Sequence, residues 1–247
     1  MELFTRTIGE KDSPVILWAH GWGHSHEAFM PLAESLVRLG KHVLIDFPGF
    51  GQSPKPDADW ATEDYADAMA AWIKEQGIGP VIWVGHSFGG RVGIQLAARH
   101  PDLIKAMCLI AGAGLKRKRP PLKKAYFWLR IKLFKFLKKL IPLGLNEDWL
   151  KSKFGSRDYN NAGPMRNILV KTISEDLTPQ ASEVRCPLML VYGRNDNETP
   201  PEFGERYHKL VPGSSLFILE GEDHYSVLSH GRHQVAALLS EFIARHA

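Results

Sequence analysis

The stretch VIWVGHSFGGRVGIQLAARH, residues 81–100, carries the strongest structural signal in this sequence. Residues 81–84 form a short β-branched and aromatic run directly after glycines and a proline that break helices, so they predict a buried strand. Residues 91–99 carry apolar side chains at helical spacing and end before Pro101, so they predict a helix. The pentad Gly-His-Ser-Phe-Gly, residues 85–89, connects the two.

This pentad has the pattern Gly-x-Ser-x-Gly, in which a sharp turn lifts a serine hydroxyl off the end of a strand. Glycine is needed on both sides because a Cβ there would collide with the neighbouring strand or with the turn itself. The serine then lies at the positive end of the following helix, where backbone N–H groups can stabilise an oxyanion. A serine that only caps the helix would fit the same five residues. The strand before and the helix after favour Ser87 as a nucleophile.

Further short apolar runs, each ending in turn residues, precede and follow this stretch. They cover residues 15–21, 42–48, 106–112, 188–193 and 215–221. Residues 29–39 and 63–76 have helical periodicity. Strands that are almost continuously apolar and alternate with helices predict an α/β fold with a mostly parallel, doubly wound sheet. Ligands of such sheets bind at the carboxyl ends of the strands.

In this setting the chain resembles the α/β-hydrolase superfamily, whose triad follows the chain order Ser, then Asp or Glu, then His. The sequence GRND, residues 193–196, follows a predicted strand and is similar to the family's Gly-x-x-Asp. The sequence GEDH, residues 221–224, follows the next strand and is similar to its Gly-x-x-His. The resemblance therefore implies Ser87 as nucleophile, His224 as base and Asp196 as the acid that orients the base.

Other residues compete for the roles of acid and base. Asp196 could be a turn former beside two asparagines, and the rival acids are Asp223, Asp176 and Glu198. The rival bases are His20, His230 and His233, none of which follows a late strand at the expected offset. His86 is interpreted as the variable position of the pentad.

The oxyanion hole of the family needs two backbone N–H groups, one from the residue after the nucleophile, here Phe88. The sequence HGWG, residues 20–23, resembles the family's His-Gly-x motif and implies Trp22 as the second donor. The loop DFPGFGQS, residues 46–53, also matches a family pattern and is interpreted as structural. His24 and His26 could be read as metal ligands, but no third ligand stands near them at a suitable spacing. We therefore expect neither a metal nor a cofactor.

The alternation of strands and helices stops between residues 114 and 180. We predict a helical cap at 114–180, inserted into a hydrolase core formed by 1–113 and 181–247. Residues 122–141 predict a helix with an apolar stripe. The stripe consists of Leu122, Tyr126, Leu129, Leu133, Phe136 and Leu140. We expect the stripe to be buried over the strand ends beside Ser87, as the lids of this superfamily commonly are.

The cap helix is strongly basic. Of the 31 Lys and Arg residues, eleven lie within 116–139, where Asp and Glu are absent, so the rest of the chain carries 20 basic and 27 acidic residues. Such a helix is too charged to span a bilayer. Its lysine face is either solvated or in contact with an anionic membrane surface or an acidic substrate group.

Length and composition suit one globular core with an insertion. Cys108 and Cys186 lie in or beside apolar runs, so we expect buried thiols rather than a disulfide. The first residues contain no basic patch followed by an apolar segment, so no secretory signal is expected and a cytoplasmic location is predicted. The predicted partner is a small-molecule acyl substrate, and no nucleic-acid partner is expected.

A serine in the pentad argues against the haloalkane dehalogenases and epoxide hydrolases, whose nucleophile is an aspartate. The resemblance implies a carboxylesterase-like serine hydrolase that cleaves a small or medium acyl ester through an acyl-enzyme. Thioesterases, perhydrolases and hydrolases of the carbon–carbon bond in dienoic diketone acids share these motifs, and fold-level analogy does not choose among them. A non-enzymatic alternative is a protein that binds an anionic surface through helix 122–141.

Overall fold

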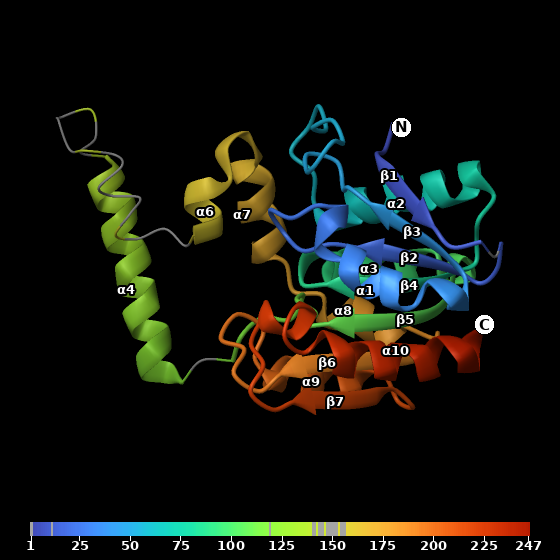
Figure 1. Ribbon diagram of the computed structural model, residues 1–247. Helices are drawn as coiled ribbons and strands as arrows, with labels where there is room; N and C mark the ends of the chain where they lie inside the picture. The colour runs from blue at the N-terminus through green and yellow to red at the C-terminus, as the bar shows by residue number, and fades with distance from the viewer. Residues whose placement is uncertain are drawn as a thin grey trace.

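A seven-stranded sheet with the order β1-β3-β2-β4-β5-β6-β7 forms the centre of the computed structural model (Figure 1). The structure describes residues 2–10, 12–118, 120–139 and 157–247, together with residues 142, 146 and 153. The strands are β1 (Thr5–Ile8), β2 (Val15–Ala19), β3 (Lys41–Ile45), β4 (Val81–His86), β5 (Ile104–Ile110), β6 (Leu188–Gly193) and β7 (Ser215–Leu219). Only the β1–β3 pair is antiparallel. The predicted mostly parallel sheet is confirmed.

Side chains of the central strands alternate between two apolar layers, one on each face of the sheet. Leu17 and Trp83 belong to one layer, and Trp18 and Val84 belong to the other. The first layer is completed by α2 (Thr62–Gln76), α3 (Phe88–Arg99), α8 (Thr178–Glu183) and α9 (Pro201–Leu210). The second is completed by α1 (Met30–Ser35) and α10 (Arg232–His246). Both faces are therefore covered, as the apolar strands predict.

Three elements differ from the prediction. β1 has no counterpart among the predicted strands, because its two middle residues are exposed and it is held by backbone pairing with β3. The helix predicted at 29–39 is divided into α1 and a 3-10 turn, Val37–Leu39. α3 begins at Phe88 rather than at residue 91, because Ser87 is already its N-terminal cap. Further 3-10 turns are His26–Ala28, Pro101–Leu103, Gly163–Met165 and Ser226–Leu228.

The chain between β5 and α8 supplies α4 (Pro121–Lys138), α6 (Arg157–Asn161) and α7 (Arg166–Ser174), and none of its described residues is in a strand. Figure 1 shows α4 apart from the sheet, with α6 and α7 between them. A cap at 114–180 remains our prediction for the division of the chain. Within the described residues, no helix is both long enough and apolar enough to cross a membrane.

The stripe on α4 is exposed, so the prediction that it is buried beside Ser87 is wrong. The exposed fraction is 86% for Leu122 and 60% for Phe136. Residues 140 and 141, the end of the predicted helix, lie outside the described residues. At about 100° per residue, Ile131 lies on the side of α4 opposite the stripe. Ile131 is the α4 residue that lines the cavity containing Ser87. The stripe therefore faces away from that cavity.

Gly89 allows α3 to begin against β2. A Cβ on Gly89 would collide with the carbonyl oxygen of Ala19, and backbone in the middle of a sheet cannot move aside as a flexible side chain can. We expect Gly89→Ala to lower the free energy of unfolding by about 1–3 kcal/mol in urea denaturation. The comparison variant is Gly231→Ala, whose Cβ would meet Glu222 Cγ and Cδ at 3.1 Å and Val227 Cα at 3.3 Å. These contacts are tight but need smaller shifts than the collision at Gly89, so Gly231→Ala should lower the free energy of unfolding less than Gly89→Ala does. Equal losses in the two variants would argue against this close approach.

Candidate active site

Ser87 occupies the sharp turn between β4 and α3. Its backbone angles, φ 48° and ψ −103°, lie in a region that L-residues rarely adopt. The turn is held because the Ser87 N–H donates to Ile110 O at 3.2 Å and the Ser87 carbonyl accepts from Ala113 N at 3.2 Å. A Cβ on Gly85 would lie 2.6 Å from the carbonyl oxygen of Gly89, so the turn has room only for glycine there. Close packing around the turn thus explains the spacing of the pentad.

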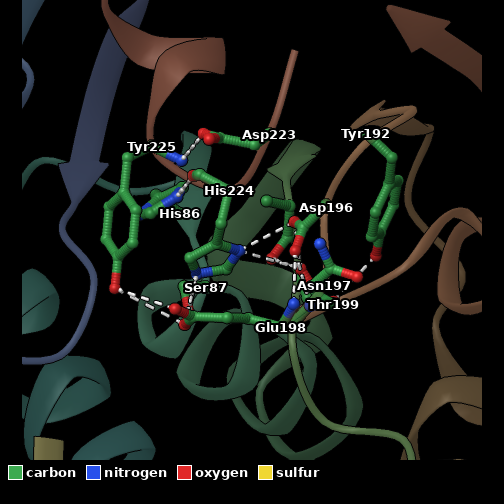
Figure 2. Close-up of polar contacts among 12 residues, drawn as sticks. His86, Ser87, Tyr192, Asp196, Asn197, Glu198, Thr199, Asp223, His224 and Tyr225 are labelled. Atoms are coloured by element: carbon green, nitrogen blue, oxygen red, sulfur yellow. Dashed lines mark hydrogen bonds and ion pairs between the residues drawn. The ribbon is translucent and has the colours of Figure 1, made fainter. Parts of the chain in front are cut away.

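Asp196 and His224 come from the loops that follow β6 and β7, at the same sheet edge as Ser87. His224 Nε2 lies 3.0 Å from Ser87 Oγ, and His224 Nδ1 lies 2.8 Å from Asp196 Oδ2 (Figure 2). A carboxylate can only accept, so Nδ1 carries the proton and donates a hydrogen bond to Asp196. Nε2 is then the acceptor that faces the serine hydroxyl. The structure thus brings the three residues of the predicted triad together.

The carboxylate of Asp196 is buried and surrounded by donors. Its Oδ1 accepts from Glu198 N at 2.7 Å and from Thr199 N at 2.8 Å, and its Oδ2 lies 2.8 Å from Thr199 Oγ1. Burial by itself raises the pKa of Asp196, but the hydrogen bonds from His224 and Thr199 outweigh it and hold this pKa below the ordinary value. Asp196 is therefore an anion at neutral pH.

The rival acids do not contact His224 Nδ1. Asp223 accepts from the backbone N–H groups of Tyr225 and Ser226 in its own turn. Asp176 accepts from Thr178. Glu198 lies closer, with Oε2 3.6 Å from His224 Nε2, but this is the nitrogen that faces Ser87 (Figure 2). In the described chain, Asp196 alone is the carboxylate that can fix the tautomer of His224.

The rival bases lie elsewhere. Both ring nitrogens of His20 are engaged, since Nδ1 lies 2.7 Å from Gly21 O and Nε2 accepts from Phe47 N at 3.0 Å. Burial lowers the pKa of His20 to about 4, so it is neutral and holds two loops together. His230 pairs with Glu222 at 2.8 Å, and His233 is exposed in the first turn of α10. Neither has a contact with Ser87.

Two residues support the site in ways that the motif patterns do not predict. His86 Nε2 donates to the carbonyl oxygen of His224 at 2.9 Å, and burial lowers the pKa of His86 to about 3. A neutral imidazole thereby ties the His224 loop to the end of β4. Thr199 binds Asp196 as described, and its Oγ1 also lies 2.9 Å from Ala111 O. The Asp-x-x-Thr spacing, typical of a turn in which the carboxylate accepts from the following backbone, is the only signal for Thr199 in the sequence.

Trp22 and Phe88, the predicted oxyanion donors, adjoin each other beside Ser87. Their rings meet edge to face with centroids 5.5 Å apart, and both residues line the same cavity as Ser87. Among the described residues, neither backbone N–H has a hydrogen-bond acceptor. Two such donors near a nucleophile can bind a developing negative charge.

Ser87 opens into a cavity of about 700 Å³, a size that suits a small or medium ligand. The cavity is lined by residues of α3, of the segment after β5, of α4 and α7, and of the loop after β6. Its apolar lining includes Trp22, Phe88, Leu115, Ile131, Leu169 and Ile173. Its charged lining is formed by Arg91, Lys116, Arg117, Asp158 and Glu198.

Arg91 is a buried cation in this cavity, one helical turn after Ser87. Its Nη1 donates to Thr172 O at 2.9 Å, and no described carboxylate forms an ion pair with it. Burial lowers the pKa of Arg91, but a guanidinium remains charged. A buried guanidinium without a carboxylate partner can bind an anionic group of a ligand. The signal in the sequence is its position four residues after Ser87, on the same face of the helix.

His26, one of the two histidines considered as metal ligands, pairs with an acidic side chain. His26 Nδ1 lies 2.8 Å from Asp46 Oδ1, and Asp46 Oδ2 accepts from Gln52 N at 2.9 Å. His26 thus ties its own loop to the loop at residues 46–53. Within the described parts of the chain, no group of three His, Cys, Asp or Glu residues could hold a metal ion.

Comparison with known proteins gives a consistent result. Residues 16–238 match the Alpha/beta hydrolase family. A pimeloyl-[acyl-carrier protein] methyl ester esterase of Neisseria meningitidis is 30% identical over 242 residues, which cover 91% of this chain and 75% of that protein. A 2-(acetamidomethylene)succinate hydrolase of Mesorhizobium japonicum is 26% identical over 90% of this chain and 85% of its own. The enol-lactonase of Burkholderia xenovorans LB400 has a similar fold, with a TM-score of 0.75, 19% identity, and coverage of 98% of this chain and 96% of that one.

Proposed function

Since the chain belongs to the α/β-hydrolase family and is an esterase-like enzyme, we propose that it is a serine carboxylesterase that cleaves a small or medium acyl ester through an acyl-enzyme. Ser87 is the nucleophile, His224 the general base and Asp196 the residue that orients it. Trp22 and Phe88 provide the oxyanion hole. Membership of an enzyme family argues against the alternative in which the chain binds an anionic surface without being an enzyme.

In the proposed reaction, Ser87 Oγ attacks the ester carbonyl carbon as its proton passes to His224 Nε2. The negative charge on the carbonyl oxygen is stabilised by the N–H groups of Trp22 and Phe88. His224 then protonates the departing alcohol, which leaves the acyl group on Ser87. Water activated by His224 releases the acid. Asp196 stays ionised and stabilises the imidazolium formed in both steps.

The observation that supports this proposal most directly is the contact chain from Asp196 Oδ2 through His224 to Ser87 Oγ, with distances of 2.8 and 3.0 Å. The cavity adds support because its mixed lining places apolar walls beside the serine. The names of the relatives make methyl esters the first substrates to examine, including a pimeloyl methyl ester borne on acyl-carrier protein.

The test is a substrate panel combined with an active-site label. We expect a fluorophosphonate probe to modify the peptide containing Ser87. We also expect kcat/KM for acyl esters to exceed that for thioesters and for dienoic diketone acids by at least about 100-fold, or about 2.7 kcal/mol. Turnover of a dienoic diketone acid without turnover of any ester would contradict the esterase proposal.

Arg91 favours a second candidate, namely a substrate that carries its own carboxylate. A dienoic diketone acid, cleaved at a carbon–carbon bond, has such a group, and the succinate in the name of one relative is also an acid. An ester of a dicarboxylic acid fits the same cation equally well. The carboxylate would lie about one helical turn, or about 5 Å, from the reacting carbonyl group.

This role of Arg91 is tested with Arg91→Met. For the monomethyl ester of a dicarboxylic acid we expect KM to rise about tenfold, since a hydrogen bond to a charged group contributes about 1.5–3 kcal/mol. For the matched dimethyl ester, which has no charge, we expect KM to change less than twofold. Arg91→Lys keeps the positive charge, so its KM for the monomethyl ester should lie between those of the parent and Arg91→Met. An equal rise in KM for both esters would show that Arg91 only holds the Thr172 carbonyl.

A further inference from the structure

The stripe on α4 is an apolar surface that faces solvent rather than the protein. Leu122, Leu129, Leu133 and Phe136 have exposed fractions of 86, 63, 48 and 60%. With Tyr126 between the first two, they recur every three or four residues, so they share one side of the helix over about 20 Å of its length. An exposed apolar surface of this extent marks a binding site more often than a random surface feature.

Positive charge borders the stripe. At about 100° per residue, Lys132 and Lys139 lie at its edge, and Lys135 and Lys138 lie on the opposite side of α4. No described carboxylate forms an ion pair with any of these four lysines. Lys132 Nζ instead lies 3.9 Å from the ring centroid of Trp128. The helix thus combines exposed aromatic and aliphatic side chains with lysines that form no ion pair with any carboxylate in the described part of the chain.

We propose that α4 is a membrane-docking helix that lies on an anionic lipid bilayer with its stripe in the hydrocarbon boundary. An apolar side bordered by lysines and containing aromatic residues is the pattern of an interfacial helix. Lysines at the edge of the stripe can extend to lipid phosphates while their methylene groups remain over the apolar surface. Each lysine brought to an anionic surface strengthens binding about fivefold.

A bilayer fits this surface better than a protein does. A second copy of the chain would bring eleven positive charges on residues 116–139 against the same eleven charges. An acidic protein could neutralise the lysines, but it would also need an apolar groove matched to the stripe. A bilayer supplies apolar volume and negative charge in one surface and needs no such groove.

The charge of the remaining chain gives the docked state an orientation. Outside residues 116–139 there are 20 basic and 27 acidic residues, so the body of the protein is repelled by an anionic surface while α4 is attracted. Ile131, opposite the stripe, lines the Ser87 cavity. A helix docked by its stripe therefore keeps Ile131, its one described residue in the lining of the Ser87 cavity, on the side away from the bilayer.

The experiment is co-sedimentation of the whole protein with phosphatidylcholine vesicles, with and without 30 mol% phosphatidylglycerol, in 50 and 500 mM NaCl. We expect at least tenfold tighter binding to the anionic vesicles at low salt, and weaker binding at high salt. A triple variant of the stripe, Leu129→Ser with Leu133→Ser and Phe136→Ser, should bind the anionic vesicles at least tenfold more weakly than the parent. The matched control Val170→Ser, Phe217→Ser removes exposed apolar side chains away from α4 and should bind like the parent.

A second pair of variants tests the orientation. The double variant with Lys132→Glu and Lys139→Glu should bind the anionic vesicles at least tenfold more weakly than the parent. The double variant with Lys135→Glu and Lys138→Glu makes the same change of charge on the opposite side of α4 and should weaken binding less than threefold. Each stripe and control variant should keep the urea midpoint of the parent and its turnover of a soluble short-chain ester. The proposal is overturned if the parent co-sediments equally with both kinds of vesicle at low salt, or if the stripe variant binds the anionic vesicles as tightly as the parent. It is also overturned if the two lysine variants lose the same amount of affinity, or if the parent is a dimer in solution and the stripe variant is not.

Discussion

Ser87→Ala should lower kcat for a 4-nitrophenyl ester by roughly 10⁴-fold or more while the protein stays folded. The substitution removes the oxygen that lies 3.0 Å from His224 Nε2 and keeps the Cβ, so the turn between β4 and α3 is preserved. Without that oxygen no acyl-enzyme forms, and only the oxyanion donors and substrate binding remain. Steady-state kinetics, the urea midpoint and loss of fluorophosphonate labelling check this prediction.

The control is a second hydroxyl in the same cavity. Ser174 also lines it, but its Oγ donates to Val170 O at 2.6 Å and contacts no histidine. Ser174→Ala should therefore keep kcat within about threefold. The cysteines offer no substitute, because burial raises the pKa of the Cys186 thiol to about 11 and that of Cys108 further still. Activity of Ser87→Ala above a tenth of the parent would mean that another nucleophile carries the reaction.

Much of the fold could be predicted because its signals are local. The parallel strands are short apolar runs with turn residues after them, and each run is found in the sheet. The proposed site residues could be located in the sequence for the same reason, since Ser87, Asp196 and His224 each follow a strand in a short motif. Parallel strands carry their loops to one edge, so the order of the motifs was enough to bring the three side chains together.

What could not be predicted depends on contacts between distant segments. β1 has no apolar pattern and exists because β3 offers backbone partners. The burial of Arg91 results from the return of α7 over α3, where Thr172 accepts from it across 81 positions of sequence. The direction of the stripe was also beyond the sequence, because periodicity shows that a helix has an apolar side but not which way that side faces.

Two carboxylates lie next to His224, each at a different ring nitrogen. Asp196 is buried against backbone donors and reaches Nδ1, whereas Glu198, two residues later, is half-exposed and lies 3.6 Å from Nε2. Figure 2 shows them on different sides of the imidazole. Sequence proximity alone does not separate these acids, but the nitrogen that each one faces does.

Asp196→Asn should lower kcat by roughly 10³–10⁴-fold, nearly as much as the loss of the nucleophile. The amide has the same shape as the carboxylate, and its orientation is fixed by the backbone. Two N–H groups, from Glu198 and Thr199, point at Oδ1 from 2.7 and 2.8 Å, so the amide oxygen must take that place. The amide nitrogen then faces His224 Nδ1, where the carboxylate oxygen Oδ2 stood.

An amide nitrogen can only donate, so it forces Nδ1 to accept and moves the imidazole proton to Nε2. A protonated Nε2 cannot take the proton of Ser87, and the imidazolium loses its counter-charge. Kinetics on a 4-nitrophenyl ester should show the loss in kcat with little change in KM. Glu198→Gln is the matched control, since it makes the same chemical change on the Nε2 side of His224. It should lower kcat by less than about tenfold. A larger loss for Glu198→Gln than for Asp196→Asn would transfer the role of the acid to Glu198.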